Sequence, residues 1–170
     1  MKDRLDNRHP HIQIGVAKAE FDKKVWESTK GVICPICERS SRVVPKTICS
    51  TQAQTLIWLY WNTVEHQYIH LNKNAPRVLV KNAETGKLKH WGLIEQMPND
   101  DPTKLKSGWV RITSAGRAFV EGKAKTYKTL FIMNDTVLGE PLEKERIDIQ
   151  DALGKKFDIR DLMRSAEKLI

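Results

Sequence analysis

The sequence predicts an α+β fold, and three patterns along the chain predict it. Residues 50–66 repeat apolar side chains at three- and four-residue intervals, which is typical of a helix packed on a core. Residues 109–113 alternate between apolar and polar side chains, as expected of a half-buried strand. Residues 158–169 return to helical spacing after a capping aspartate, Asp158. Helices and strands therefore alternate within one chain.

The segment from 50 to 122 has the most informative order of elements. Ser50 or Thr51 caps its first helix, and the 96–108 segment is a polar loop. The predicted elements are a buried helix at 50–66, a short strand at 68–71, a short helix at 77–80, a second helix at 83–91, and two strands flanking the loop. This is the order of a winged helix-turn-helix, in which the helix before the strand pair enters the DNA major groove and the loop forms the wing.

The predicted recognition helix at 83–91 has one apolar stripe and one polar face. Leu88 and Trp91 lie three residues apart and are expected to face the core, which leaves donors for bases and phosphates outside or at the flanks. The predicted DNA-binding residues, from this helix, the wing and the adjoining strand, are Lys81, Thr85, Lys87, Lys89, His90, Lys104, Lys106 and Arg111. Asp100 and Asp101 in the wing would repel phosphate if they faced the DNA.

The net charge of the 170-residue chain is +8, and it is concentrated on the same segment. Residues 72–128 carry twelve basic and five acidic side chains, a net charge of +7, compared with +3 for residues 1–71 and −2 for residues 129–170. A positive field of this kind attracts DNA phosphate in a salt-dependent way. A solvated basic surface with no nucleic-acid partner is the alternative explanation.

The sequence Cys34-Pro-Ile-Cys37 predicts a zinc knuckle, because a tight turn would direct two thiols at one point. A tetrahedral ion needs two more ligands. His66 and His70 are four residues apart, on or just beyond a helix, so helical geometry would place both imidazoles on one face. The predicted structural zinc site is therefore formed by Cys34, Cys37, His66 and His70.

Other interpretations of these residues stay open. Cys49, His9 and His11 are further candidate ligands, and Cys49 also fits a buried free thiol. His70 lies in an alternating Tyr-Ile-His-Leu pattern, which is also that of a strand residue without metal. A redox role for the cysteine pair is disfavoured, because no βαβ pattern surrounds it.

Three regions are expected: residues 1–49 with the knuckle, the winged-helix domain at 50–122, and residues 123–170 packed on it. Phe21, Val25 and Trp26 predict a short helix or strand in the first region. In the last, residues 130–133 and 137–141 predict a hairpin, which residues 145–149 extend. Helices are expected at 148–154 and after Asp158, the latter packed within the chain or used in a homodimer.

Composition and motifs exclude several classes of protein. The chain has neither a signal-peptide core nor an apolar run long enough to span a membrane, so a cytoplasmic location without membrane contact is expected. Three cysteines argue against a disulfide framework. Glycine-rich phosphate loops, GxSxG and HExxH are missing from the sequence, which argues against an enzyme.

Five segments together resemble a family of small phage- and prophage-encoded proteins that are described as winged-helix-like and have no assigned role. These segments are Cys34-Pro-Ile-Cys37, the central helix at 56–60, Lys87-Leu-Lys-His-Trp-Gly-Leu-Ile-Glu95, residues 109–122 and residues 151–158. The resemblance covers roughly residues 32–163 and implies a phage context, hence the host cytoplasm, and a structural role for the cysteine pair.

Two functions are consistent with the sequence. The first is a phage-type DNA-binding protein that acts on double-stranded DNA in transcription regulation or DNA metabolism. The second is an interaction module that binds and modulates a host protein, such as a nuclease, a polymerase or a defence enzyme, because winged helices often serve as protein-binding scaffolds.

Overall fold

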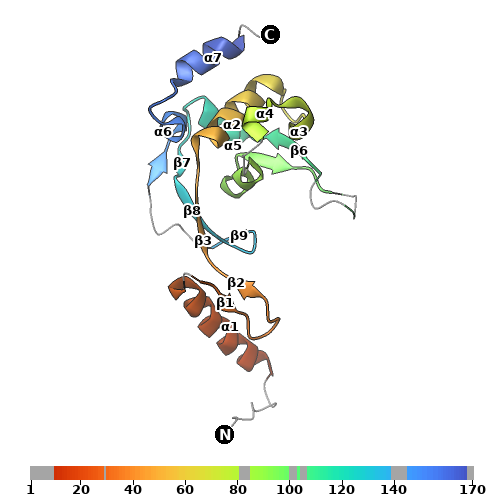
Figure 1. Ribbon diagram of the computed structural model, residues 1–170, viewed down its shortest axis with the longest axis vertical. Coiled ribbons are helices and arrows are strands. Elements are labelled where there is room, and N and C mark those ends of the chain that lie inside the picture. The colour runs from red at the N-terminus through yellow and green to blue at the C-terminus, as the bar shows by residue number, and fades with distance from the viewer. Residues whose placement is uncertain are drawn as a thin grey trace. The chain divides into compact units, whose positions relative to one another are not determined.

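The computed structural model describes residues 10–28, 30–80, 85–99, 103, 107–138 and 145–167, which form a mixed α+β protein with small antiparallel sheets (Figure 1). The elements are α1 (Pro10–Glu27), β1 (Val32–Ile33), β2 (Ser40–Ser41), β3 (Val44–Thr47), α2 (Ser50–Asn62), β4 (Ile69–His70), α3 (Leu71–Asn74), α4 (Arg77–Val80), the 3₁₀ helix η1 (Thr85–Trp91), β5 (Ile94–Gln96), β6 (Trp109–Ile112), α5 (Ser114–Val120), β7 (Thr126–Tyr127), β8 (Thr129–Met133), β9 (Thr136–Val137), β10 (Arg146–Ile147), α6 (Ile149–Leu153) and α7 (Ile159–Glu167). None of the described helices is both long and apolar enough to cross a membrane.

The chain divides into two compact units, and each is built from two separate segments. The first unit contains Met1–Lys46 and Phe131–Gly139, and the second contains Thr47–Leu130 and Glu140–Ile170. Residues 123–170, expected to form one region, contribute to both units, because most of β8 and all of β9 belong to the first.

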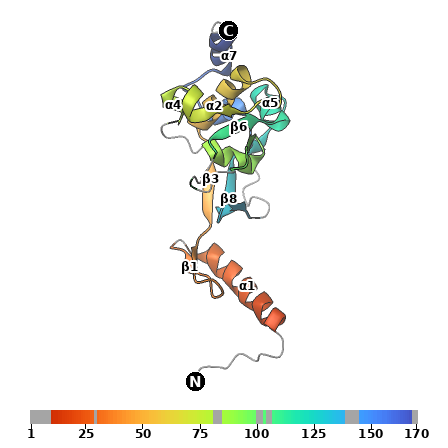
Figure 2. The same ribbon diagram turned by 90° about the vertical axis from the view of Figure 1, so that its right-hand side faces the viewer.

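In the first unit, α1 lies along the β1–β2 hairpin in both views (Figures 1 and 2). The hairpin pairs Val32 with Ser41 in an antiparallel register. Helical spacing places Phe21 and Val25 on one buried face of α1, and Trp26 packs on the Phe131 ring with centroids 5.4 Å apart. The predicted short helix or strand is therefore a helix, and it extends over 18 residues.

The second unit is organised on α2. The helix begins after Cys49, whose backbone N–H donates to Gln52 Oε1 at 3.0 Å, so the cap lies one residue before the predicted Ser50. It ends at Asn62, four residues earlier than predicted, and Thr63 Oγ1 donates to the Leu59 carbonyl at 2.6 Å in the last turn. The first part of its apolar stripe, Ala53, Leu56 and Ile57, is buried together with Leu59, whereas Tyr60 and Trp61 are half-buried and Val64 is exposed.

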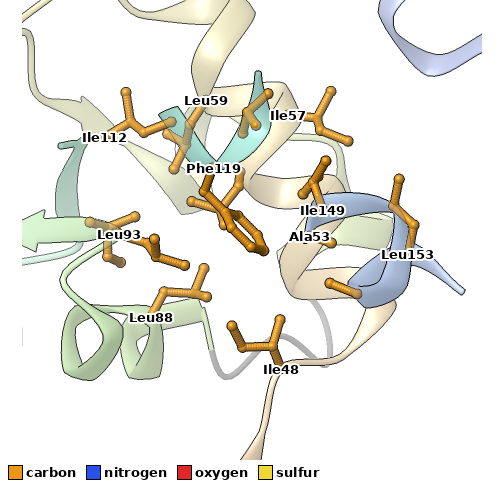
Figure 3. Packing of buried hydrophobic residues seen from close by; sticks show 14 of the residues in the cluster. Ile48, Ala53, Ile57, Leu59, Leu88, Leu93, Ile112, Phe119, Ile149 and Leu153 are labelled. Atoms are coloured by element: carbon orange, nitrogen blue, oxygen red, sulfur yellow. The ribbon is translucent and has the colours of Figure 1, made fainter. Parts of the chain in front are cut away.

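Phe119 of α5 lies at the centre of the core of the second unit. Its ring is fully buried, and Figure 3 shows it surrounded by apolar side chains from α2, η1, β6 and α6 and from the turn before β5. The labelled neighbours include Ala53, Leu88, Leu93 and Ile149. Removing a buried aromatic side chain of this kind typically costs about 3–5 kcal/mol, so this core accounts for much of the stability of the unit.

A three-stranded antiparallel sheet of order β4-β6-β5 packs against this core. β6 is its central strand, with Val110 paired to Ile69 of β4 and Ile112 paired to Ile94 of β5. The alternation predicted for β6 is present, because Val110 and Ile112 are buried while Trp109 is exposed. The helices α3 and α4 and the 3₁₀ helix η1 lie between the edge strands in the chain.

The sequence Thr-Ser-Ala-Gly after β6 starts α5 and brings it close to the end of η1. Thr113 Oγ1 accepts the Gly116 N–H at 3.0 Å as the helix cap and donates to the Gly92 carbonyl at 2.6 Å. Gly116 lies directly over the Leu93 carbonyl, where a Cβ would overlap the oxygen. The absence of a side chain at Gly116 therefore allows α5 to contact the η1–β5 turn.

The C-terminal region contains the predicted β8–β9 hairpin, whose turn residues Asn134 and Asp135 both have positive φ, at 50° and 65°. Residues 145–149 do not extend this hairpin as predicted. Instead, β10 pairs with β7, and α6 begins after its cap, Asp148. Ile159 and Leu162 of α7 pack partly on the core of the second unit, as expected for a helix packed within the chain.

Candidate functional site

The 3₁₀ helix η1 replaces the α-helix predicted at 83–91, as far as residues 85–91 are described. A 3₁₀ helix has three residues per turn, so positions 85, 88 and 91 lie on one face. Thr85 and Leu88 are buried on that face, and Trp91 Nε1 donates to the Tyr127 carbonyl at 2.7 Å. The predicted outward position of Thr85 is wrong, because the tighter helix aligns this residue with the apolar stripe.

The remaining side chains of η1 are divided between its two other edges. With three residues per turn, Lys87 and His90 share one edge, and Lys89 lies on the other with Gly86. Lys87, Lys89 and His90 are half-buried and interact with other residues of the chain. They lie on the two edges of a helix whose third face is anchored in the core.

Arg111 of β6 lies in a polar cluster on the sheet. Its Nε and Nη2 atoms donate to Glu95 Oε2 at 2.9 and 2.6 Å, and its guanidinium lies 4.9 Å from the centre of the Tyr68 ring. The Tyr68 hydroxyl also donates to Glu95 Oε1, at 2.7 Å. Hydrogen bonds from Tyr68 and then from Arg111 lower the pKa of Glu95. Arg111 therefore links β5 to β6, a structural role that sequence reasoning missed.

A groove of about 650 Å³ is lined on one side by residues of η1 and the preceding helices and on the other by residues of the β5–β6 pair. Its lining includes Val80, Thr85, Lys89, Met97, Pro98 and Trp109. The Oγ1 atom of Thr85 is buried without a hydrogen-bond partner. The basic helix η1 and the β5–β6 strand pair therefore border the same open groove.

Gly108, one of the residues that line this groove, lies against the ring of His70. Gly108, just before β6, has a φ of +77°, and a Cβ there would lie 2.8 Å from Nε2 of His70. The His70 ring packs edge-on against Trp109, with centroids 5.5 Å apart, and its Nδ1 atom is buried without a hydrogen-bond partner. His70 is therefore a packed strand residue, as its alternating sequence pattern had left open, but the hydrogen bonding of its ring is incomplete.

The described part of residues 71–112 is strongly basic, with five basic side chains and one acidic one, Glu95. Two of the basic residues, Lys73 of α3 and Arg77 of α4, are exposed, and they were missed as site residues although they belong to the basic segment. Beyond this region, Lys123 and Lys128 lie within 3.0 Å of Glu121 and Glu145, respectively. Three predicted DNA-binding residues, Lys81, Lys104 and Lys106, and the wing aspartates Asp100 and Asp101 lie outside the described residues.

The cysteine pair occupies the turn between β1 and β2 in the first unit. Cys34 and Cys37 are free thiols 3.6 Å apart. The Cys34 backbone N–H donates to the Arg39 carbonyl, and the Glu38 N–H donates to the Cys34 carbonyl, both at 2.9 Å. The backbone N–H groups of Cys37 and Ile36 donate to the Cys34 sulfur and lower the pKa of its thiol. The turn therefore favours the thiolate, which is the form that binds metal.

The predicted histidine ligands are not arranged as expected. α2 ends at Asn62, so His66 lies in the following turn with a φ of +67°, and its Nε2 atom is 3.8 Å from Glu65 Oε1. His70 lies in β4, so helical geometry does not bring the two imidazoles onto one face. Within the described ranges, the structure has no group of three or more His, Cys, Asp or Glu side chains able to hold a metal ion.

The other candidate metal ligands were Cys49, His9 and His11. Cys49 is exposed at the start of α2, so the buried thiol that its sequence context suggested is wrong. His9 lies outside the described residues, and His11 belongs to α1.

Comparison with protein-family models, with curated proteins and with solved structures finds no match to this chain.

Proposed function

We propose that this protein is a winged-helix protein that binds double-stranded DNA, acting in phage transcription regulation or DNA metabolism as the resemblance to phage-encoded proteins implies. The observation that carries the proposal is the arrangement of the second unit. Its helix, strand, two short helices, 3₁₀ helix and strand pair follow the order of that fold, and the sheet order β4-β6-β5 places the last strand between the other two. In this arrangement η1 is the recognition helix and the loop between β5 and β6 is the wing.

The dimensions of η1 are compatible with groove binding. The DNA major groove, roughly 12 Å wide, admits an α-helix, and the tighter 3₁₀ helix also fits; at about 2.0 Å per residue, the seven residues of η1 extend about 14 Å along it. Anchoring of Thr85, Leu88 and Trp91 in the core leaves the two outer edges, with Lys87 and Lys89, for DNA. A rigid basic helix loses little conformational entropy on binding.

Charge supports the same surface. Lys73 and Arg77 of the preceding helices are exposed, and Lys89 lines the groove beside the strand pair. These side chains suit contacts to the phosphate backbone, which position a protein on DNA without reading sequence. Arg111 binds Glu95, so we assign it to holding the strand pair together, with any phosphate contact secondary.

The test is binding of a fluorescent random-sequence duplex to the full-length protein across a salt series. Each phosphate neutralised contributes about −0.9 to the slope of log K against log salt, so Lys87→Ala with Lys89→Ala should reduce the slope by about 1.8. A matched control is Lys155→Ala with Lys156→Ala, two exposed lysines between α6 and α7. This control should leave the slope unchanged.

Two outcomes would count against the proposal. No binding at low salt would refute DNA binding, and equal slopes for the two double variants would refute η1 as the contacting element. If DNA binding is absent while the protein retains a host protein from nuclease-treated lysate, the alternative of a host-protein interaction module is supported.

A further inference from the structure

The β1–β2 turn has the geometry of half a tetrahedral metal site. Four thiolates around zinc, with Zn–S bonds of about 2.3 Å, are separated from one another by about 3.8 Å. The distance of 3.6 Å between Cys34 and Cys37 is close to that value and far longer than the disulfide bond of about 2.05 Å. The turn is closed by two backbone hydrogen bonds and supplies two N–H donors to the Cys34 sulfur, so its own backbone holds the pair in place.

The surroundings of the pair favour metal binding over redox chemistry. Reactive CxxC pairs lie at the start of a helix, whereas here the turn leads into β2. Glu38, directly after Cys37, has a φ of +59°, an uncommon conformation for a residue other than glycine. The chain thus accepts a strained residue to close a turn that presents two sulfurs.

Two ligands fill half of the coordination shell, and the part of the chain that the structure describes supplies no third ligand to the pair. The pair is also bordered by apolar side chains on the surface. Ile33, just before Cys34, is 60% exposed and Ile36, between the cysteines, is 58% exposed. Two isoleucines beside an open metal position form a surface that another protein molecule could cover.

We propose that Cys34 and Cys37 bind zinc together with the same two cysteines of a second copy of this chain, so that one ion joins a symmetric dimer. The two-fold axis passes through the metal, and each copy contributes one identical turn. Ile33 and Ile36 then pack against their counterparts around the ion. Glu38 and Arg39 are adjacent, exposed and of opposite charge, so each copy can present an acidic group to a basic group of the other.

The second copy is the occupant that this chemistry fits best. Four thiolates and one zinc ion carry a net charge of −2, and each copy brings Arg39 and Arg42, both exposed, to the same hairpin. The symmetry requires no partner of different composition. This inference does not depend on DNA binding, although a dimer would present two copies of η1 to two half-sites.

The test measures metal content and oligomeric state of the reduced full-length protein by metal analysis and sedimentation, with zinc and after chelation. The expected result is 0.5 zinc per chain, a dimer with zinc and a monomer after chelation. Cys37→Ser should abolish zinc binding and dimerisation, whereas Cys49→Ser, a matched cysteine in the second unit, should change neither. Circular dichroism of each variant confirms folding.

A second variant tests the surface while keeping all thiols. Ile33→Glu with Ile36→Glu should raise the dimer dissociation constant in zinc by at least about tenfold, because like charges would meet across the axis. Val64→Glu, at a residue 71% exposed in the second unit, is the control and should have no effect. One zinc per monomeric chain would overturn the proposal, and the variants His9→Ala, His11→Ala, His66→Ala and His70→Ala would then locate the other ligands. Failure of the reduced protein to bind zinc would overturn it as well.

Discussion

Replacing Gly116 by Ala tests the contact that fixes α5 against the end of η1. The new Cβ would overlap the Leu93 carbonyl oxygen and approach Ile112 Cγ1 to 2.8 Å. The Leu93 oxygen is part of the backbone and accepts the Thr113 N–H at 3.1 Å. It cannot move away as the end of a flexible side chain would, so relief of the overlap has to displace α5 or break that hydrogen bond.

The magnitude follows from three contributions. Overpacking of a well-packed site costs about 1–3 kcal/mol, and loss of one backbone hydrogen bond adds about 0.5–1.5 kcal/mol. The higher helix propensity of alanine offsets about 0.5–1 kcal/mol of this. The free energy of unfolding should therefore fall by about 2 kcal/mol, within a range of roughly 0.5–4 kcal/mol.

The assay is urea unfolding of full-length protein followed by tryptophan fluorescence, because four of the five tryptophans belong to the second unit. Gly15→Ala is the matched control. Gly15 lies in α1, and a Cβ added there would have no atom within 4 Å, so the same substitution should stabilise the helix slightly. A Gly116→Ala protein as stable as the parent would refute the close approach of α5 to Leu93.

Two further substitutions test local features of the second unit. Asp148→Ala removes the α6 cap that accepts the Asp151 N–H and should lower the free energy of unfolding in urea by about 0.5–2 kcal/mol, with Asp148→Asn recovering most of the loss. Tyr68 and then Arg111 lower the pKa of Glu95, so the folded state gains stability above the ordinary pKa of 4.5 and loses it as the pH falls through the lower folded-state pKa. Glu95→Gln should therefore flatten the fall in thermal unfolding midpoint below about pH 4.5. If the thermal unfolding midpoint of Glu95→Gln falls at acid pH as steeply as that of the parent, the cluster of Glu95 with Tyr68 and Arg111 does not stabilise the fold.

The spacing of apolar residues predicted those helices and strands whose local conformational preference agrees with the face that they bury. The α2 stripe and the alternation of β6 were read directly from apolar spacing, because each element buries one face. The end of α2 was placed four residues late, since Val64 continues the apolar spacing although it is 71% exposed. Pairing of β10 with β7 rather than with the adjacent hairpin depends on long-range contacts, which short sequence patterns do not encode.

The candidate site was predicted less well, for a geometric reason. The choice of outward residues on η1 depends on whether the helix has 3.6 or 3 residues per turn, and Thr85 changes face between the two. The assumption of α-helical geometry also led to the prediction that His66 and His70 bind the same metal ion. By contrast, the cysteine turn depends on four consecutive residues, so its spacing was enough to predict that Cys34 and Cys37 come together.

Because the first unit is built from two separate segments, it cannot be removed from the chain by a single truncation. A fragment starting at Thr47 would keep the residues from Phe131 to Gly139 but lose Trp26, the aromatic partner of Phe131. Ile132, which is 5% exposed in the full chain, belongs to that same segment. Loss of the first unit in evolution would therefore require two coordinated changes, removal of the N-terminal residues and replacement of most of the β8–β9 hairpin by a short polar turn.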